Sequence, residues 1–363
     1  MSITIEHIRA ALRAAQDPNT GLDLGVSVKD RDIQLDGGRV AVALELGYPA
    51  DAATLEQVRG IAQAALAGAG APDAQVSVTW KVAAHAVQKT LKPLPNVRNI
   101  IAVASGKGGV GKSTTAVNLA LALAAEGAKV GLLDADIYGP SVPTMLGVSG
   151  RPESRDNKTM EPLVGHGVQA NSIGFLIDAD SPAIWRGPMV TQALEQLLRQ
   201  TNWRDLDYLI VDMPPGTGDV ALTLAQKVPV VGAVIVTTPQ DVALADARKG
   251  LRMFQKVDVP ILGVVENMAI HICSQCGHAE HIFGAGGGQR MAEQFETPWL
   301  GSLPLTLAIR EQTDAGTPTV VSDAGSEAAG LYRAIARKLA AGVAALPRDM
   351  AGKFPSIVVQ QPT

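Results

Sequence analysis

Residues 106–113 read GKGGVGKS and constrain the fold of this chain more than any other segment. They match the phosphate-binding pattern G-x-x-x-x-G-K-[ST] at each fixed position. The apolar run of residues 100–104 precedes the loop, and the helical pattern TTAVNLALALAAEG follows it. This strand–loop–helix context is the one that the pattern requires, so we predict a nucleotide site in an α/β fold.

The loop itself supplies the first candidate site residues. Its glycines let backbone N–H groups approach phosphate oxygens, and the N-terminus of the following helix adds positive potential. Lys112 is predicted to contact the β- and γ-phosphates of ATP, and the Ser113 hydroxyl is predicted to ligate Mg²⁺. The predicted ATP-binding residues are Gly106, Lys107, Gly108, Gly109, Val110, Gly111, Lys112, Ser113 and Thr114.

Three aspartates follow other apolar runs. Asp212 ends the run YLIV, and Asp134 and Asp136 end KVGLLDAD. Ligands bind at the carboxyl ends of strands in open α/β sheets, so we expect these side chains near the phosphate loop. We interpret Asp212 as holding Mg²⁺ or its water, Asp134 as supporting the metal shell, and Asp136 as orienting the attacking water. The alternative for Asp134 and Asp136 is a turn without a ligand.

The whole sequence predicts two unequal units. Residues 1–88 combine helical spacing with alternating runs around Asp36-Gly37-Gly38, as in a small α+β domain. Residues 89–98 contain two prolines and are predicted to be a linker. In residues 99–345, short apolar runs alternate with helices, which indicates a mostly parallel sheet covered by helices. Residues 346–363 lack periodicity and are expected to form a mobile tail.

Charge and hydropathy narrow the functions further. The formal net charge of −4 argues against non-specific nucleic-acid binding. No apolar run reaches the ~18 residues of a transmembrane helix, and the start of the chain lacks the pattern of a signal peptide. We therefore expect a cytoplasmic protein that binds neither nucleic acid nor membranes.

Cys273 and Cys276, the two cysteines of the chain, form a C-x-x-C motif in HICSQCGHAEHIFGAGG. A redox pair would open a helix, and inert thiols would need an apolar setting; neither suits this glycine-rich segment. A zinc site within one chain or shared by two stays open. A [4Fe–4S] cluster ordinarily takes four thiolates, which two symmetric copies could supply. His271, His278 and His281 are not assigned as ligands.

Six motifs occur in the order of the Mrp/ApbC family of iron–sulfur cluster carrier ATPases, which this chain resembles. They are GKGGVGKST, LLDADIYGPSVPTMLG, WRGPM, VDMPPGTGD, VENM and CSQCG. The loop resembles the deviant Walker A loop of the MinD/nitrogenase-iron-protein class of P-loop NTPases. In that class the extra lysine, here Lys107, reaches across a homodimer to the partner's phosphates. The resemblance also implies an adenine contact at Asn267 and a bridging [4Fe–4S] cluster on Cys273 and Cys276. The predicted catalytic residues are Lys107, Lys112, Asp136 and Asp212.

The resemblance implies a homodimeric ATPase that carries a [4Fe–4S] cluster from assembly machinery to apo-proteins, with ATP and Mg²⁺ as cofactors. The N-terminal unit is similar to a domain often attached to iron–sulfur assembly proteins, but it has no cysteine, so we expect it to dock or regulate. One alternative is a MinD/ParA-like positioning switch whose C-x-x-C binds structural zinc; it would need a basic or amphipathic surface that the sequence lacks. An electron donor resembling the nitrogenase iron protein would take its cysteines from two well-separated positions, whereas this chain has a single C-x-x-C.

Overall fold

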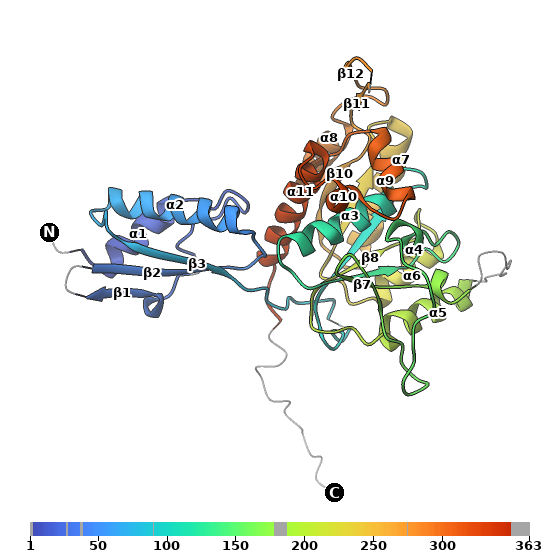
Figure 1. Cartoon of the computed structure of the whole chain (residues 1–363), viewed down its shortest axis with the longest axis horizontal. Coiled ribbons are helices and arrows are strands. Elements are labelled where there is room, and N and C mark those ends of the chain that lie inside the picture. The colour runs from blue at the N-terminus through green and yellow to red at the C-terminus, as the bar shows by residue number, and fades with distance from the viewer. Residues whose placement is uncertain are drawn as a thin grey trace, which may run out of the picture.

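The structure is a computed structural model that describes residues 3–26, 28–36, 39–89, 91–177, 187–273 and 275–349. Figure 1 shows a small N-terminal unit beside a larger one that carries a projecting hairpin at its top.

The small unit packs two helices on a three-stranded sheet. Strand β1 (Ile33–Asp36) pairs antiparallel with β2 (Arg39–Leu46), with Asp36 opposite Arg39, as the alternating sequence predicts. Strand β3 (Gln75–Trp80) pairs parallel with β2, because helix α2 (Ala52–Gly68) crosses between them. Helix α1 (Ile5–Ala14) begins at Thr4, whose hydroxyl accepts the His7 N–H, and buries Ile8 and Leu12. A short 3₁₀ turn, η1 (Asp30–Asp32), leads into β1.

The large unit is built on an eight-stranded sheet in the order β13-β10-β9-β4-β8-β5-β7-β6. Every neighbouring pair is parallel except β6–β7, which is antiparallel at one edge. The predicted fold class, a mostly parallel sheet covered by helices plus a small α+β domain, is confirmed. The strands are β4 (Val97–Ser105), β5 (Val130–Asp134), β6 (Leu163–Gly165), β7 (Val168–Ser172), β8 (Leu206–Asp212), β9 (Gly232–Thr237), β10 (Ile261–Glu266) and β13 (Trp299–Ser302).

Helices cover both faces of this sheet, which explains why its central strands are apolar at nearly every position. Ile101 and Val103 of β4 face one core, while Ile100 and Ala102 face the other. The first core includes side chains of α3 (Lys112–Ala125), α4 (Val142–Met145), α9 (Leu307–Asp314), α10 (Thr319–Ser322) and α11 (Glu327–Ala344). The second includes side chains of α5 (Gly187–Gln200), α6 (Asp219–Lys227), α7 (Asp241–Lys256) and α8 (Gly287–Gln294). A 3₁₀ turn, η2 (Ile173–Phe175), follows β7.

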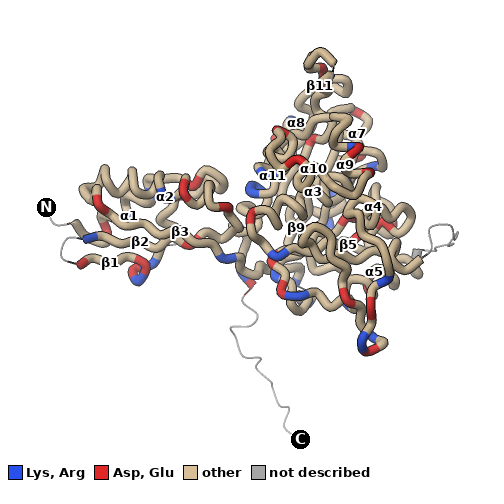
Figure 2. Tube along the Cα trace, in the orientation of Figure 1, with Lys and Arg blue, Asp and Glu red and all other residues tan. Residues whose placement is uncertain are grey.

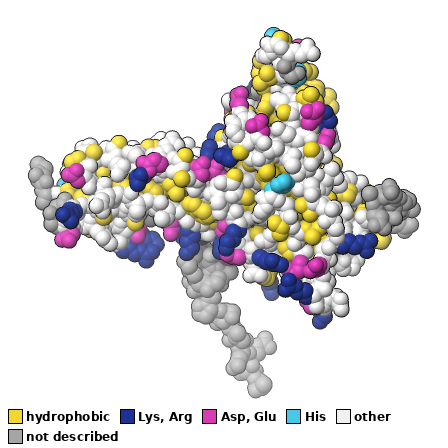
Figure 3. Space-filling view, in the orientation of Figure 1, with side chains coloured by type: hydrophobic (Ala, Val, Ile, Leu, Met, Phe, Trp, Pro, Cys, Tyr) yellow, Lys and Arg dark blue, Asp and Glu magenta, His cyan; other side chains and the backbone are white. Residues whose placement is uncertain are grey.

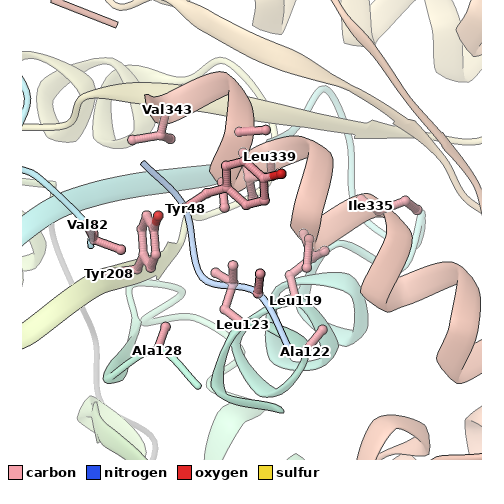
Figure 4. Close-up of a cluster of buried hydrophobic side chains, with 14 of the residues drawn as sticks. Tyr48, Val82, Leu119, Ala122, Leu123, Ala128, Tyr208, Ile335, Leu339 and Val343 are labelled. Carbon is pink, nitrogen blue, oxygen red and sulfur yellow. The ribbon is translucent and has the colours of Figure 1, made fainter. Parts of the chain in front are cut away.

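The first core continues into the small unit, so the two units share one hydrophobic cluster. Figure 4 shows the Tyr48 ring beside Leu339 of α11 and near Leu123 of α3. Polar contacts reinforce this junction. The buried carboxylate of Glu126, just after α3, accepts the Asp51 N–H at 3.0 Å and pairs with Arg337 of α11 at 2.9 Å.

The beginning of the C-terminal segment differs from the expected mobile tail. Within the described residues 346–349, the Pro347 carbonyl accepts the Ala86 N–H, and the Asp349 N–H donates to Ala84. These bonds form because residues 84–86 lie antiparallel to residues 347–349. This is a tertiary pairing that no local sequence pattern reveals. Residues 350–363 lie outside the described residues.

His85 lies in this pairing and is 2% exposed, with Nδ1 at 2.9 Å from Oδ1 of Asn99. Burial lowers the pKa of His85 below its usual value. The folded state therefore favours the neutral ring. The neutral His85 ring contributes fully to the free energy of unfolding above the ordinary histidine pKa of about 6.5. This contribution is lost as the pH falls through the lowered pKa of the folded state.

We therefore expect the free energy of unfolding to decline below about pH 6.5, by at most about 1.4 kcal/mol per pH unit from this one proton. Urea unfolding between about pH 7.5 and about pH 5.5 measures this decline, and the His85→Gln variant should show a shallower one. Equal slopes in the two proteins would contradict the assignment.

No helix among the described residues is both long enough and apolar enough to span a bilayer. Figure 2 shows Lys and Arg interspersed with Asp and Glu along both units.

Candidate nucleotide site and cysteine hairpin

The candidate site residues meet at the carboxyl ends of the central strands. Strands β4 and β5 flank β8, and both Val103 of β4 and Asp134 of β5 lie opposite Asp212 of β8 in the parallel register. This register places the carboxylates of Asp134 and Asp212 on adjacent strands directly beside the loop that leaves β4. The sheet thus brings together residues about 80 to 100 positions apart in the sequence.

The phosphate loop connects β4 to α3 and surrounds a cavity of about 210 Å³. Gly111, the residue before α3, has a φ of +80°, a left-handed conformation that glycine adopts without strain. A Cβ on Gly106 would lie 2.1 Å from the carbonyl carbon of Asp246 in α7, so this close approach also requires glycine. The cavity is lined by Ser105, Lys107, Gly108, Gly109, Gly111, Lys112, Ser113, Thr114, Asp136, Ser141, Met145 and Pro215.

Lys112 and Asp212 form a buried ion pair behind this cavity. The Lys112 Nζ lies 2.5 Å from Oδ1 of Asp212 and donates to the Ser113 hydroxyl at 3.1 Å. Asp212 is fully buried, and its second oxygen, Oδ2, has no hydrogen-bond partner among the described residues. The three groups predicted to serve phosphate and metal are therefore in mutual contact, with one carboxylate oxygen left for a further ligand.

Asp134 and Asp136 occupy different environments. Asp134 is fully buried, and its oxygens accept hydrogen bonds from the Asp136 N–H, the Val142 N–H and the Ser172 hydroxyl. Burial, and next the nearby Asp212 carboxylate, raise its pKa. Asp136 instead lines the cavity, and burial raises its pKa while Lys112 partly offsets that rise. Of the two, Asp136 is the carboxylate that a bound nucleotide could reach.

Lys107 is half-buried and lines the cavity on the same loop as Lys112. Its own carbonyl accepts the Ser105 hydroxyl at 2.9 Å, which fixes the backbone of the loop at this point. Among the described residues its ammonium group forms no ion pair, in contrast to Lys112.

Asn267, the residue predicted to contact adenine, follows β10 and is buried against the loop from the other side. Its Nδ2 donates to the Val110 carbonyl at 3.0 Å. A Cβ on Gly111 would lie 2.1 Å from the same nitrogen. The role of Asn267 toward a base stays a prediction, but its contact with the phosphate loop is direct.

Both cysteines lie in a small hairpin beyond β10. Strands β11 (His271–Ile272) and β12 (Ala279–Glu280) pair antiparallel, and the Cys273 carbonyl accepts the Gly277 N–H at 2.9 Å. Cys273 is half-buried and Cys276 is exposed, and both are free thiols. The backbone N–H groups of Cys276 and Gln275 point at the Cys273 sulfur and lower its pKa. This turn thus favours the thiolate form that binds metal or cluster.

Two histidines near the cysteines contact backbone carbonyl groups through their rings. The Nδ1 atoms of His271 and His281 lie 3.2 Å from the Leu305 carbonyl and 2.6 Å from the Ala269 carbonyl, respectively. The His271 contact ties the hairpin to the segment after β13, and the His281 contact joins the two ends of the hairpin segment. Among the described residues no group of three or more His, Cys, Asp or Glu is arranged to hold a metal ion. Figure 3 shows apolar side chains along the projecting hairpin, where Ile272 and Ile282 are exposed.

Glu266 is a buried residue near the site that the sequence patterns did not single out. It is 2% exposed and accepts the N–H groups of Gly286 and Gly288 at the start of α8. The available signal was a charged residue ending the apolar run ILGVV.

Comparisons with known proteins cover both units. Residues 96–340 match a family described as NUBPL iron-transfer P-loop NTPase, and residues 5–80 match a family described as iron–sulfur cluster assembly protein. An iron–sulfur cluster carrier protein of Pseudomonas fragi is 60% identical over 269 residues, 74% of this chain and 94% of the relative. One of Haemophilus influenzae is 48% identical over 92% of this chain and 90% of the relative. A nucleotide-binding protein of Archaeoglobus fulgidus, solved with ADP, is 36% identical with a TM-score of 0.55, covering 61% of this chain and 88% of its own.

Proposed function

We propose that this chain, which belongs to the NUBPL iron-transfer P-loop NTPase family, is an ATP-dependent carrier of iron–sulfur clusters. One observation carries this proposal beyond family membership. The phosphate loop and the cysteine hairpin leave the same edge of the sheet, and Asn267, at the base of the hairpin segment, donates a hydrogen bond to the loop. Nucleotide binding and cargo binding therefore have a direct structural connection.

ATP would bind in the cavity of the phosphate loop. Without nucleotide, Lys112 pairs with Asp212. When ATP binds, the Lys112 ammonium group would contact the phosphates instead. Ser113 and the free Oδ2 of Asp212 fit a Mg²⁺ site, since both are oxygen donors of the kind that Mg²⁺ prefers. When bound, Mg²⁺ would neutralise charge on the phosphates. Asp136 would hold the attacking water, because it is the predicted carboxylate that lines the cavity.

A [4Fe–4S] cluster, the proposed cargo, needs four thiolates, and one chain supplies two. We propose that two copies meet at the carboxyl edge of the sheet and share it. Large apolar side chains are exposed in segments that follow three strands at this edge: Tyr138 is 63% exposed, Val242 70% and Leu307 56%. In the proposed dimer these side chains would lie at the interface between the two copies. Assembly machinery would load the dimer, and apo iron–sulfur proteins would receive the cluster.

The positioning switch with a zinc-binding C-x-x-C is not favoured, since the family match and the named relatives concern iron–sulfur transfer. A cytoplasmic location completes the proposal and is supported by the two free cysteines.

Anaerobic reconstitution of the wild-type chain tests the proposal, with iron, sulfide and zinc measured together with native mass. We expect about four irons and four sulfides per pair of chains. Zinc bound without sulfide, on a chain of monomeric mass, would refute it.

Asp136→Asn is expected to lower ATP turnover by about 10²-fold or more, since an amide cannot accept a proton from the attacking water. ATP affinity should stay near that of the wild type, because Lys112 and the loop remain. Steady-state phosphate release and equilibrium nucleotide binding measure the two effects. Asp258→Asn, the same change at an exposed residue after α7, is the matched control. Unaltered turnover in Asp136→Asn would remove it from the catalytic residues.

A further inference from the structure

Glu266 is a buried carboxylate to which neither nucleotide nor cluster chemistry assigns a role. It ends β10, and its side chain points at the N-terminus of α8. Oε1 accepts the Gly286 N–H at 3.3 Å, and Oε2 accepts the N–H of Gly288. In the described part of the chain no Lys, Arg or His forms an ion pair with it. The carboxylate is thus stabilised by backbone N–H groups and by the positive end of the helix.

These hydrogen bonds close the segment that carries the cysteines. The segment leaves the sheet at Asn267, next to Glu266 in the chain, and returns at Gly286. Glu266 therefore holds the returning end against the departing end. Its own carbonyl accepts the Leu303 N–H at 2.9 Å, which fixes Glu266 to the strand-end region of β13.

The departing end touches the phosphate loop. Asn267 donates to the Val110 carbonyl at 3.0 Å, and its backbone N–H donates to Thr237 at 2.7 Å. The following residue, Met268, has a φ of +57°, an unfavourable backbone conformation for a side chain of its type. A change in the loop around Val110 would therefore act on a strained, tightly bonded turn beside Glu266.

We propose that Glu266 is a positioning residue that transmits the state of the phosphate loop to the cysteine hairpin. The path runs from Val110 through Asn267 to Glu266, and from its carboxylate to Gly286 and Gly288. When nucleotide rearranges the loop, the closure at Glu266 changes the hairpin with it. That this coupling serves to control cluster binding rests on the proposed function. The coupling itself does not require a bound cluster and can be measured in the cluster-free protein.

The two cysteines make the coupling measurable without a cluster. Because both lie in the hairpin, every thiol signal of the protein reports on that hairpin. The rate of reaction with 5,5′-dithiobis(2-nitrobenzoate) is recorded with and without saturating ADP, at a protein concentration where ADP leaves the native mass unchanged. We expect ADP to change the wild-type rate at least about fivefold, the lower end of typical coupling between two sites.

Glu266→Gln replaces one accepting oxygen by an amide nitrogen that cannot accept an N–H. We expect ADP to change its thiol rate less than about twofold while ADP affinity stays close to the wild-type value. Glu293→Gln, the same change at an exposed residue of α8, should behave as the wild type. If Glu266→Gln does not fold, Gly288→Ala serves instead, because its Cβ would lie 3.0 Å from the Cβ and 3.2 Å from Oε2 of Glu266 and would crowd this side chain against the start of α8.

Two results would overturn the proposal: a wild-type thiol rate indifferent to ADP, or an ADP effect that persists in full in Glu266→Gln or its substitute. Neither result depends on iron or sulfide. If the reconstitution experiment refutes the carrier function, the thiol experiment still tests the role of Glu266. If the thiol experiment refutes the role of Glu266, the carrier function is not affected.

Discussion

Replacing Lys107 with Ala is expected to lower ATP turnover by about 10³-fold or more, the loss typical when a cationic group supplied in trans is removed from a phosphoryl-transfer site. The physical reason is that the Lys107 ammonium group has no ion pair among the described residues, so its charge could stabilise the negative charge that develops on a phosphoryl group in the transition state. ATP affinity should change little, because the loop backbone and Lys112 remain. Phosphate release and nucleotide binding are measured on the same preparation, with Lys256→Ala, an exposed lysine at the end of α7, as control.

Mixing variants decides whether Lys107 acts on its own nucleotide or on a partner's. Lys107→Ala retains an intact phosphate loop, and Lys112→Ala retains Lys107 while losing its own site. In a mixture that exchanges subunits, half of the dimers are mixed and each has one competent site, so about a quarter of wild-type turnover should return. A mixture as inactive as its components would show that Lys107 does not act across a dimer.

Replacing Cys276 with Ser is expected to abolish stable cluster binding. A pair of chains then offers two thiolates in place of the four that a [4Fe–4S] centre ordinarily takes. Iron and sulfide per chain should fall to background after anaerobic reconstitution, and the visible absorption of the cluster should disappear. ADP affinity should stay unchanged, since the hairpin lies outside the cavity of the phosphate loop.

His278→Ala is the matched control for Cys276→Ser, because it alters an exposed residue of the same hairpin that we do not assign as a ligand. It should load iron and sulfide as the wild type does. If His278→Ala lost the cluster while Cys276→Ser kept it, the ligand assignment would be wrong.

The sequence predicts the architecture well where structure follows from local pattern. The strand–loop–helix around residues 106–113 and the antiparallel pair at Asp36–Arg39 are both found where the pattern places them. Other features depend on contacts between distant segments. The antiparallel strand β6, the pairing of residues 346–349 with residues 84–86, and the hydrophobic cluster shared by the two units have no local signal.

The same division holds for the candidate site. Residue types and spacing single out Lys112, Asp212 and the two cysteines. They do not reveal that Lys112 rests on Asp212, that Asp134 is saturated by three hydrogen bonds, or that Asn267 holds the Val110 carbonyl. Glu266 escaped notice because its role lies in backbone N–H groups 20 and 22 residues further along the chain, and such partners have no side-chain signature.

Cluster transfer to an apo-acceptor tests the central claim most directly. The reconstituted chain is mixed anaerobically with an apo-protein that takes a [4Fe–4S] cluster, with an iron chelator present to capture released iron. Activity or spectrum of the acceptor is followed with ATP, with ADP and without nucleotide. The carrier account predicts that the acceptor gains its cluster despite the chelator, at a rate that depends on the nucleotide. Iron that passes to the chelator and leaves the acceptor empty, whatever nucleotide is present, would contradict it.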